Sequence, residues 1–165
     1  MNFESLIEKV KHIPYGRNSI RNDFSLVISE NKGTCSSKHA FLKEFADKNN
    51  IKNVKLFIGI FKMTESNTSK IYPLFSENEL SYIPEAHCYL KINGIPVDAT
   101  TTESFYQIIK NEIIEELEII PSQASHFKVI YHQEFIKKWI LETKQNKSFE
   151  EIWRIREQCI LKLSI

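Results

Sequence analysis

Residues 86 to 101 read AHCYLKINGIPVDATT and carry the clearest local structural signal in the chain. Two apolar-rich runs, His87 to Ile92 and Ile95 to Thr100, flank the dipeptide Asn93-Gly94. Asn-Gly is the strongest short-range signal of a β-hairpin, because a type I′ turn needs a positive φ at both central residues. The sequence therefore predicts an antiparallel hairpin with Asn93-Gly94 at its turn.

The two-residue turn fixes which side chains share a face of this hairpin. It places Asp98 opposite Tyr89 and His87 opposite Thr100, and because side chains alternate between faces, all four lie on one side. His87 and Asp98 become diagonal neighbours, about 7–8 Å apart at their backbones and within side-chain reach. A three-residue loop would send them to opposite faces unless a bulge restored the register.

The opposite face of the hairpin is apolar and is predicted to lie in the core. Its members are Cys88, Leu90, Ile92, Val97 and Ala99. Cys88 is therefore interpreted as a buried structural thiol, although it follows His87 directly.

A helix is predicted upstream of the hairpin, beginning at Gly33-Thr34 and ending near Lys48. Thr34 is a suitable N-cap, because its hydroxyl can accept a free backbone N–H of the first turn. A strand follows from Val54 to Met63, indicated by its β-branched and aromatic residues.

The remaining chain is interpreted from its periodicity and its turn residues. Helices are expected at 2–11, 103–117, 135–141 and 149–161, strands at 71–75 and 127–131, a loop with one short strand at 17–34, and a turn at 64–69. The strands lie in runs joined by turns, which favours an α+β fold with a small antiparallel sheet over a doubly wound parallel sheet.

Composition excludes several classes of protein. A chain of 165 residues corresponds to one domain, and we expect residues 1–165 to form a single unit. Lys+Arg 22 against Asp+Glu 21 leaves a formal charge of +1, so no electrostatic attraction to nucleic acid or to an acidic membrane is indicated. The longest apolar run, Leu56 to Phe61, is too short to span a membrane.

Cysteine usage and the N-terminal sequence indicate a reducing compartment. Three scattered cysteines, Cys35, Cys88 and Cys159, do not make a disulfide framework. Glu4 and Glu8 interrupt the apolar run that a signal peptide needs. A cytoplasmic location is therefore expected, where a free cysteine is either a small core residue or a working thiol.

Cys35 has the position of a nucleophile. Free N–H groups and the helix dipole at the start of a helix favour the thiolate, which is the reactive form of cysteine. A nucleophile needs a base, and the base needs an acceptor that orients it. On the predicted hairpin, His87 and Asp98 have the residue types and the shared face for these two roles.

These residues resemble the transglutaminase-like superfamily, which has a papain-related fold for cysteine catalysis. Gly33-Thr34-Cys35-Ser36-Ser37-Lys38-His39-Ala40 is similar to the family's helix start, His87-Cys88-Tyr89 to its histidine strand, and Val97-Asp98-Ala99-Thr100 to its aspartate strand. The resemblance covers about residues 33 to 101, and the predicted strand from Val54 lies where the family has one.

The resemblance implies a papain-like, transglutaminase-like core, in which the cysteine helix packs on a small antiparallel sheet and extra helices follow at the C-terminus. Residues 1–32 would flank the cleft and residues 103–165 would form a helical cover. It also implies acyl transfer without a cofactor on a peptide or amide-containing substrate. The acidic calcium-binding loop of the cross-linking members is missing from the sequence, so hydrolysis, deamidation and acyl transfer remain open.

In the implied mechanism, Cys35 attacks the carbonyl, His87 holds and returns the proton, and Asp98 fixes the imidazole. The backbone N–H of Cys35 would be one oxyanion donor. The second oxyanion donor stays open among three residues of the upstream polar segment, namely Tyr15, Asn18 and Asn22. Two further residues are candidate substrate contacts: His39, one turn after Cys35, and Tyr89, on the face of His87.

Two other interpretations of the same residues stand beside this one. The chain is alternatively a non-catalytic binding or scaffolding module of the same superfamily. Cys35, His39, His87 and Cys88 are also zinc-competent ligand types, but their spacing matches no standard zinc pattern, and no metal site is expected.

Overall fold

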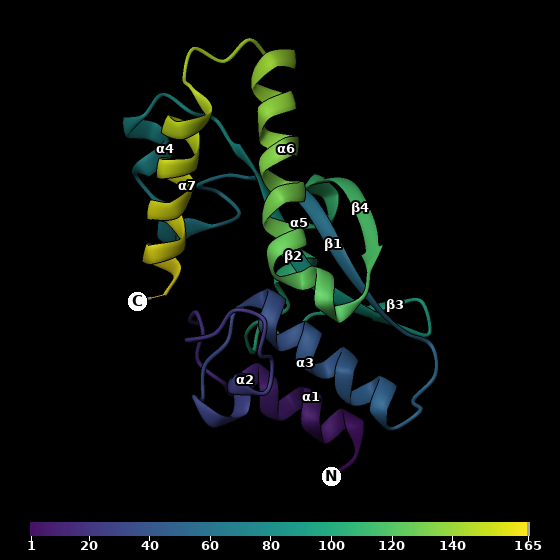
Figure 1. The fold of residues 1–165 in the computed structure, drawn as a ribbon. Coiled ribbons are helices and arrows are strands. Elements are labelled where there is room, and N and C mark those ends of the chain that lie inside the picture. The colour runs from purple at the N-terminus through teal and green to yellow at the C-terminus, as the bar shows by residue number, and fades with distance from the viewer. Residues whose placement is uncertain (165) are drawn as a thin grey trace.

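A four-stranded antiparallel sheet runs through the middle of the molecule, and helices pack on both sides of it (Figure 1). The structure is a computed structural model and describes residues 1–164. The strands are β1 (Val54–Met63), β2 (Ile83–Ile92), β3 (Ile95–Val97) and β4 (Ile113–Ile119), in the spatial order β3-β2-β1-β4. The fold is α+β, which confirms the predicted class.

The described residues also form seven α-helices and three 3-10 helices. The α-helices are α1 (Phe3–His12), α2 (Leu26–Ser29), α3 (Cys35–Lys48), α4 (Leu74–Glu77), α5 (Phe105–Ile109), α6 (His126–Glu142) and α7 (Phe149–Leu163). The 3-10 helices are η1 (Ser69–Ile71), η2 (Lys110–Glu112) and η3 (Pro121–Ala124).

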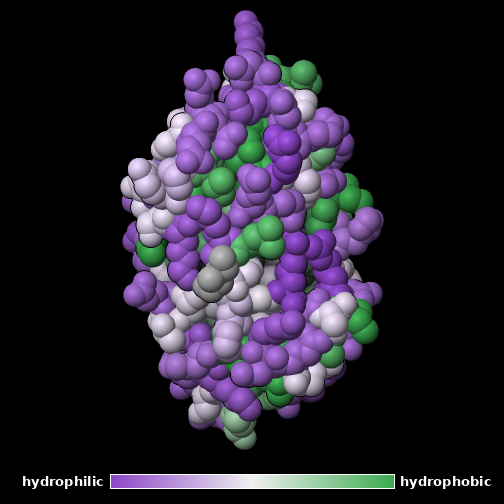
Figure 2. Space-filling view, turned by 90° about the vertical axis from the view of Figure 1, so that its left-hand side faces the viewer, coloured by the Kyte–Doolittle hydropathy of each residue, from purple (hydrophilic) through white to green (hydrophobic). Residues whose placement is uncertain are grey.

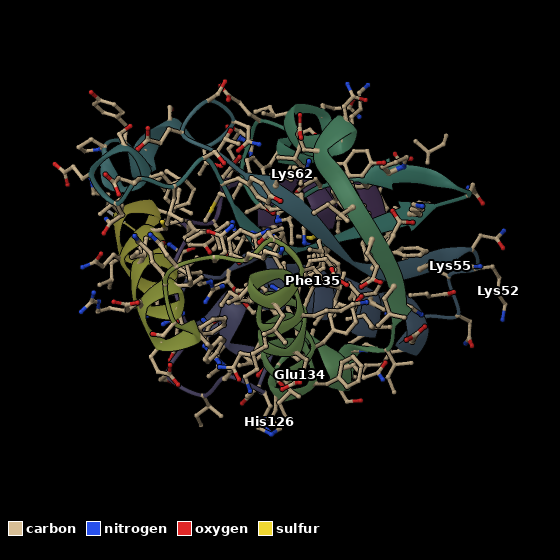
Figure 3. The ribbon with its side chains drawn as sticks, turned by 90° about the horizontal axis from the view of Figure 1, so that it is seen from above. Lys52, Lys55, Lys62, His126, Glu134 and Phe135 are labelled. Carbon is tan, nitrogen blue, oxygen red and sulfur yellow. The ribbon has the colours of Figure 1, made fainter. Side chains whose placement is uncertain are left out.

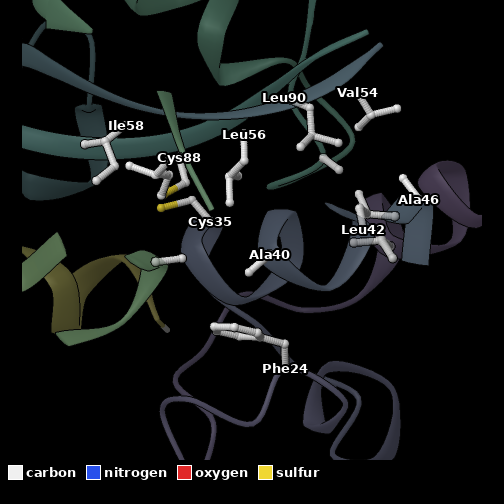
Figure 4. Close-up of a cluster of buried hydrophobic side chains, with 14 of the residues drawn as sticks. Phe24, Cys35, Ala40, Leu42, Ala46, Val54, Leu56, Ile58, Cys88 and Leu90 are labelled. Atoms are coloured by element: carbon white, nitrogen blue, oxygen red, sulfur yellow. The ribbon is translucent and has the colours of Figure 1, made fainter. Parts of the chain in front are cut away.

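One core lies between the sheet and α3. Figure 4 shows α3 running along the sheet, with Leu42 and Ala46 facing β1 and β2, and Phe24 covering the far side of the helix. Alternate residues of the two central strands point into this core, as the two-residue period of a strand requires. The N-terminal helix α1 packs against α3 from outside.

A second core lies at the other end of β1 and β2. Phe61 and Met63 of β1 pack there with Trp139 of α6 and Ile155 of α7. Phe135 of α6 points toward the sheet and packs against both cores, whereas Glu134 and His126 point outward (Figure 3). The C-terminal helices therefore close the end of the sheet that lies next to the start of α3.

The predicted hairpin register is confirmed. Leu90 pairs with Val97 and Ile92 with Ile95, which makes Asn93-Gly94 a two-residue turn. Both turn residues have positive φ, 51° and 78°, as a type I′ turn requires. The ladder ends at Val97, so Asp98 lies in the loop just beyond the paired residues rather than within a strand.

The prediction of one long helix over 103–117 was wrong. The segment divides into α5, the 3-10 turn η2 and the edge strand β4, so the proposed cover of residues 103–165 contributes a strand as well as helices. Apolar Ile113 and Leu117 are four apart, a spacing that fits one helical face and equally one strand face. Pairing with the exposed edge of β1 selects the strand, and the ladder contains an irregularity at Ile60/Phe61.

Three shorter predictions were also wrong. Residues 127–131 belong to α6, because Lys128, His132, Ile136 and Trp139 form one buried helical stripe that continues beyond residue 131. Residues 71–75 form parts of η1 and α4, and the segment 17–34 contains the helix α2 in place of the expected short strand. In each case tertiary packing overrides the local β propensity of a few apolar residues.

Gly59 of β1 is held against a buried aromatic ring, and this contact gives a testable prediction. A Cβ at position 59 would lie 2.9 Å from the Tyr89 ring. Gly59→Ala should therefore destabilise the fold by about 1–3 kcal/mol, because a rigid buried ring must shift. Urea unfolding monitored by circular dichroism measures this loss.

Gly16→Ala is the matched control, since its Cβ would meet Lys32 at an ordinary 3.5 Å. We expect it to unfold like the wild type. Equal stability of the two variants would contradict the predicted clash at Gly59.

Candidate active site

Cys35 is the first residue of α3, at the point where the helix meets β2. Thr34 caps the helix, since its hydroxyl accepts the N–H of Ser37 and the Ser37 hydroxyl accepts the N–H of Thr34. The N–H groups of Cys35 and Ser36 donate to no other residue within 1–164. The helix start thus offers two unused donors beside the sulfur, as oxyanion stabilisation requires.

His87 and Asp98 form a buried pair next to this helix start. The His87 Nε2 lies 2.7 Å from the Asp98 Oδ2. The ring of Phe105 stands edge-on to the imidazole at 5.0 Å between centroids, and the ring of Phe61 at 6.4 Å. The predicted meeting of His87 and Asp98 is confirmed, and the charge of His87 also acts on the Cys35 thiol.

Asp98 is held by four hydrogen bonds. Its Oδ1 accepts from the backbone N–H and the hydroxyl of Thr100, at 3.0 and 2.6 Å. Its Oδ2 accepts from His87 and from the backbone N–H of Tyr106, at 2.8 Å. Although burial favours the neutral acid, the His87 charge and these donors hold the pKa of Asp98 well below its usual range. The carboxylate is fixed in place and is charged throughout the neutral range.

His39 and Lys38 of α3 form hydrogen bonds to backbone groups around the site. Nδ1 of His39 donates to the Cys35 carbonyl at 2.7 Å, and its Nε2 accepts the backbone N–H of Ala99 at 2.7 Å. Lys38 is fully buried and donates to the carbonyls of Ile13 and Thr100. The two side chains tie the cysteine helix to the loop that carries Asp98.

Lys128 of α6 approaches the thiol from the other side. Its Nζ lies 3.7 Å from the Cys35 Sγ and 2.7 Å from the Ser36 hydroxyl oxygen. The side chain is 8% exposed, so its charge acts on the sulfur with little screening by water. Burial alone would lower the Lys128 pKa, but the nearby Cys35 charge raises it.

The two cations make Cys35 an acidic thiol. Burial alone would raise the Cys35 pKa, but the charges of Lys128 and His87 outweigh burial and lower it to about 6. Burial likewise opposes the charged imidazole, yet Asp98 and Cys35 raise the His87 pKa to about 10. Both shifts favour the form of the pair in which Cys35 is a thiolate and His87 is an imidazolium.

The pKa values of the other two cysteines are raised rather than lowered. Both are buried, and burial raises the pKa of Cys88 to about 11 and of Cys159 to about 12. Cys88 lies in the core as predicted, and its sulfur points toward that of Cys35 (Figure 4).

The three candidates for the second oxyanion donor lie in different places. A parallel bridge between Tyr15 and Gly33 holds Tyr15 beside the start of α3, where it lines both cavities at Cys35. Asn18 lines one of these cavities, but its amide N–H groups already donate to Glu30 and Lys32. Asn22 is exposed and lines neither cavity. Of the three, Tyr15 is therefore the remaining candidate for the second donor.

Neither candidate substrate contact is open to a ligand. His39 is fully buried, and backbone groups occupy both of its nitrogens. Tyr89 is fully buried, and its hydroxyl donates to Glu116 of β4. We interpret both as structural residues that support the site.

Three charged residues of the site were not predicted. Lys128 was missed because residues 127–131 were predicted to form a strand. A lysine on the buried face of a helix such as α6 would have indicated a functional role. Glu85 lies two residues before His87 on the same strand face, so alternation alone would have placed it in the site. Arg156 of α7 forms a two-pronged ion pair with Glu85, at 2.8 and 2.9 Å.

Two cavities meet at Cys35. The cationic chamber is lined by Arg17, Arg21, Lys128 and Arg156, together with Tyr15 and Ser36. The apolar chamber is lined by Phe61, Met63, His87, Phe105, Ile160 and Leu163. Hydrophilic residues dominate the face of the molecule on which α4 and α7 lie (Figure 2).

Residues 1–164 contain no group of three or more His, Cys, Asp or Glu side chains arranged to hold a metal ion. Among the same residues, no helix has the length and apolar character needed to cross a membrane. Comparisons of the chain with protein-family models, with curated proteins and with solved structures found no match.

Proposed function

We propose that this protein is a cysteine-dependent acyl-transfer enzyme that uses Cys35, His87 and Asp98 through a thioester intermediate. The observation that carries the proposal is the buried chain of charges: Asp98 bonded to His87, with a cysteine of lowered pKa beside it at a helix start. The resemblance to the transglutaminase-like superfamily, and through it to a papain-like core, supports the same class of reaction.

The arrangement supports a two-step reaction. The Cys35 thiolate attacks an amide or ester carbonyl, forming a C–S bond, while the backbone N–H of Cys35 and the Tyr15 hydroxyl receive the oxyanion. The His87 imidazolium gives its proton to the leaving group as the old acyl bond breaks. His87 then accepts a proton from water or another nucleophile, which attacks the thioester and regenerates the thiolate.

Lys128 stabilises the resting state of this mechanism. Its ammonium keeps Cys35 ionised in a buried setting that would otherwise favour the neutral thiol. The role of Asp98 is electrostatic and orienting: it accepts from Nε2 of His87 and so turns Nδ1 toward the sulfur.

The pH dependence of iodoacetamide labelling tests the proposal. Cys35 should label with a midpoint near pH 6, since the thiolate is the reactive form and its pKa is about 6. Peptide mass spectrometry on the native protein separates Cys35 from Cys88 and Cys159, which serve as internal controls. The midpoint is the quantity to compare, because a less basic thiolate is also a weaker nucleophile and the rate alone mixes both effects.

The opposite result would favour the non-catalytic alternative. A binding or scaffolding module has no need of an activated thiol, so Cys35 would then label only near the range of an ordinary thiol, about pH 8.5. Lys128→Met should raise the Cys35 midpoint by removing one of the two cations. A midpoint that stays near pH 6 in that variant would contradict the role given to Lys128.

A further inference from the structure

We propose that the acyl donor of this enzyme carries a carboxylate on its acyl portion and that Arg21 binds this group in the cationic chamber. The inference rests on the proposed function and names the class of its substrate. Two observations support it. Arg21 is a positive charge without an anionic partner in the cationic chamber, and His87 lines the apolar chamber.

Three of the four cations of the cationic chamber already have an anionic partner. Arg156 is paired with Glu85, and Arg17 lies 3.1 Å from the carboxylate of Glu157. Lys128 faces the Cys35 sulfur. Arg21 forms no ion pair and no hydrogen bond with any residue of the described chain. One positive charge is thus left over in a chamber beside the nucleophile.

The surroundings of Arg21 favour an incoming anion. Partial burial and the like charges of Arg17 and Arg156 lower the Arg21 pKa, and the charge of Glu157, which is already paired with Arg17, opposes them only in part. An anion beside Arg21 would relieve that repulsion. A single unpaired guanidinium is matched in charge by a monoanion, and its fork of N–H donors fits the two oxygens of a carboxylate.

A second polar group in the same chamber also lacks a partner. The side-chain amide oxygen of Asn18, Oδ1, is buried and accepts no hydrogen bond within residues 1–164. Buried acceptors are normally satisfied, so the chamber offers an unused acceptor as well as an unused cation. A ligand with an N–H near its carboxylate would satisfy both.

The place of His87 decides which half of the substrate occupies each chamber. His87 must pass its proton to the leaving group, and it lines the apolar chamber but not the cationic one. The leaving group therefore enters the apolar chamber, beside Phe61 and Phe105, and the acyl portion extends into the cationic chamber. Lys70, on the exposed rim of the apolar chamber, is the competing cation.

A pair of chromogenic esters tests the inference. The probes are the mono-4-nitrophenyl ester of adipic acid, which carries a carboxylate, and its methyl ester, which has the same reactive group and no charge. In both, the Cys35 thiolate forms a C–S bond to the carbonyl carbon, and the C–O bond breaks to release 4-nitrophenolate. We expect the anionic ester to acylate Cys35 about tenfold faster or more, after correction for spontaneous hydrolysis.

Arginine variants locate the binding group. Arg21→Gln should abolish the preference for the anionic ester over the neutral ester. Arg154→Gln, on the exposed face of α7, is the matched control and should keep the preference. Loss of the preference in Lys70→Gln instead of Arg21→Gln would overturn the proposed orientation, because the carboxylate would then lie in the apolar chamber.

The two probes also separate this inference from the proposed function. If Cys35 is acylated equally by both esters, the enzyme chemistry stands and the carboxylate site is disproved. If neither ester acylates Cys35, while Cys35→Ala behaves like the wild type, the acyl-transfer function itself is disproved.

Discussion

In the proposed acyl transfer, His87→Ala should lower the rate of amide cleavage by about 10²–10⁴-fold, the usual contribution of a general acid–base residue. An amine leaves only after it receives a proton, and His87 is the group that holds one, with a pKa raised to about 10 by Asp98 and Cys35. The same variant should move the midpoint of Cys35 labelling above pH 6, because one of the two cations that stabilise the thiolate is lost.

The leaving group distinguishes this role from a structural one. The 4-nitroanilide of adipic acid needs a proton at its nitrogen, whereas the matching 4-nitrophenyl ester releases a stable anion without one. His87→Ala should therefore slow the anilide far more than the ester. His126→Ala, an exposed histidine of α6, is the control and should react like the wild type (Figure 3). Equal losses with the anilide and the ester would argue that His87 only supports the fold.

Arg156→Met should destabilise the protein by about 3–5 kcal/mol, because it leaves Glu85 as a buried charge without a partner. Glu85 is 6% exposed, and its two oxygens accept from the guanidinium of Arg156. Urea unfolding measures the loss. Arg154→Met changes an exposed arginine two positions away on the same helix, so its stability should stay close to that of the wild type.

A double variant and a pH series test the cause of this loss. Replacing both partners, in Glu85→Met with Arg156→Met, should recover much of the stability, because no buried charge remains. Although burial would raise the Glu85 pKa, Arg156 lowers it from 4.5 to about 2 in the folded state. The contribution of the pair is therefore complete above pH 4.5 and disappears as the pH falls through 2. If the single variant Arg156→Met were as stable as the wild type at pH 7, this account would be contradicted.

The part of the site that depends on local rules could be predicted from the sequence. Asn93-Gly94 permits only a short turn, and the two-residue period then places His87 and Asp98 on one side, where they are in contact. Thr34 likewise marks the start of the cysteine helix. In each case the outcome depends on a few neighbouring residues, and distant packing has no competing effect.

The remaining part depends on contacts between distant segments. Lys128 belongs to the site only because α6 packs on β2, and its own neighbours have the β-branched and aromatic character of a strand. The edge strand β4 exists because β1 offers it an open side, which no pattern within 113–119 reveals. The Tyr15 side chain was a candidate among three, and the bridge to Gly33 distinguishes it.

The distance along the chain between Lys128 and Cys35 has a consequence for biosynthesis. Ninety-three positions separate the ammonium from the sulfur that it stabilises, so during translation Cys35 is made long before its activating charge. Until α6 and β2 are in place, the nascent chain carries an ordinary thiol that is mostly protonated at neutral pH. The thiol of the growing polypeptide is therefore less ionised than that of the folded protein, and the effect of Lys128 on Cys35 begins only when α6 has packed beside the start of α3.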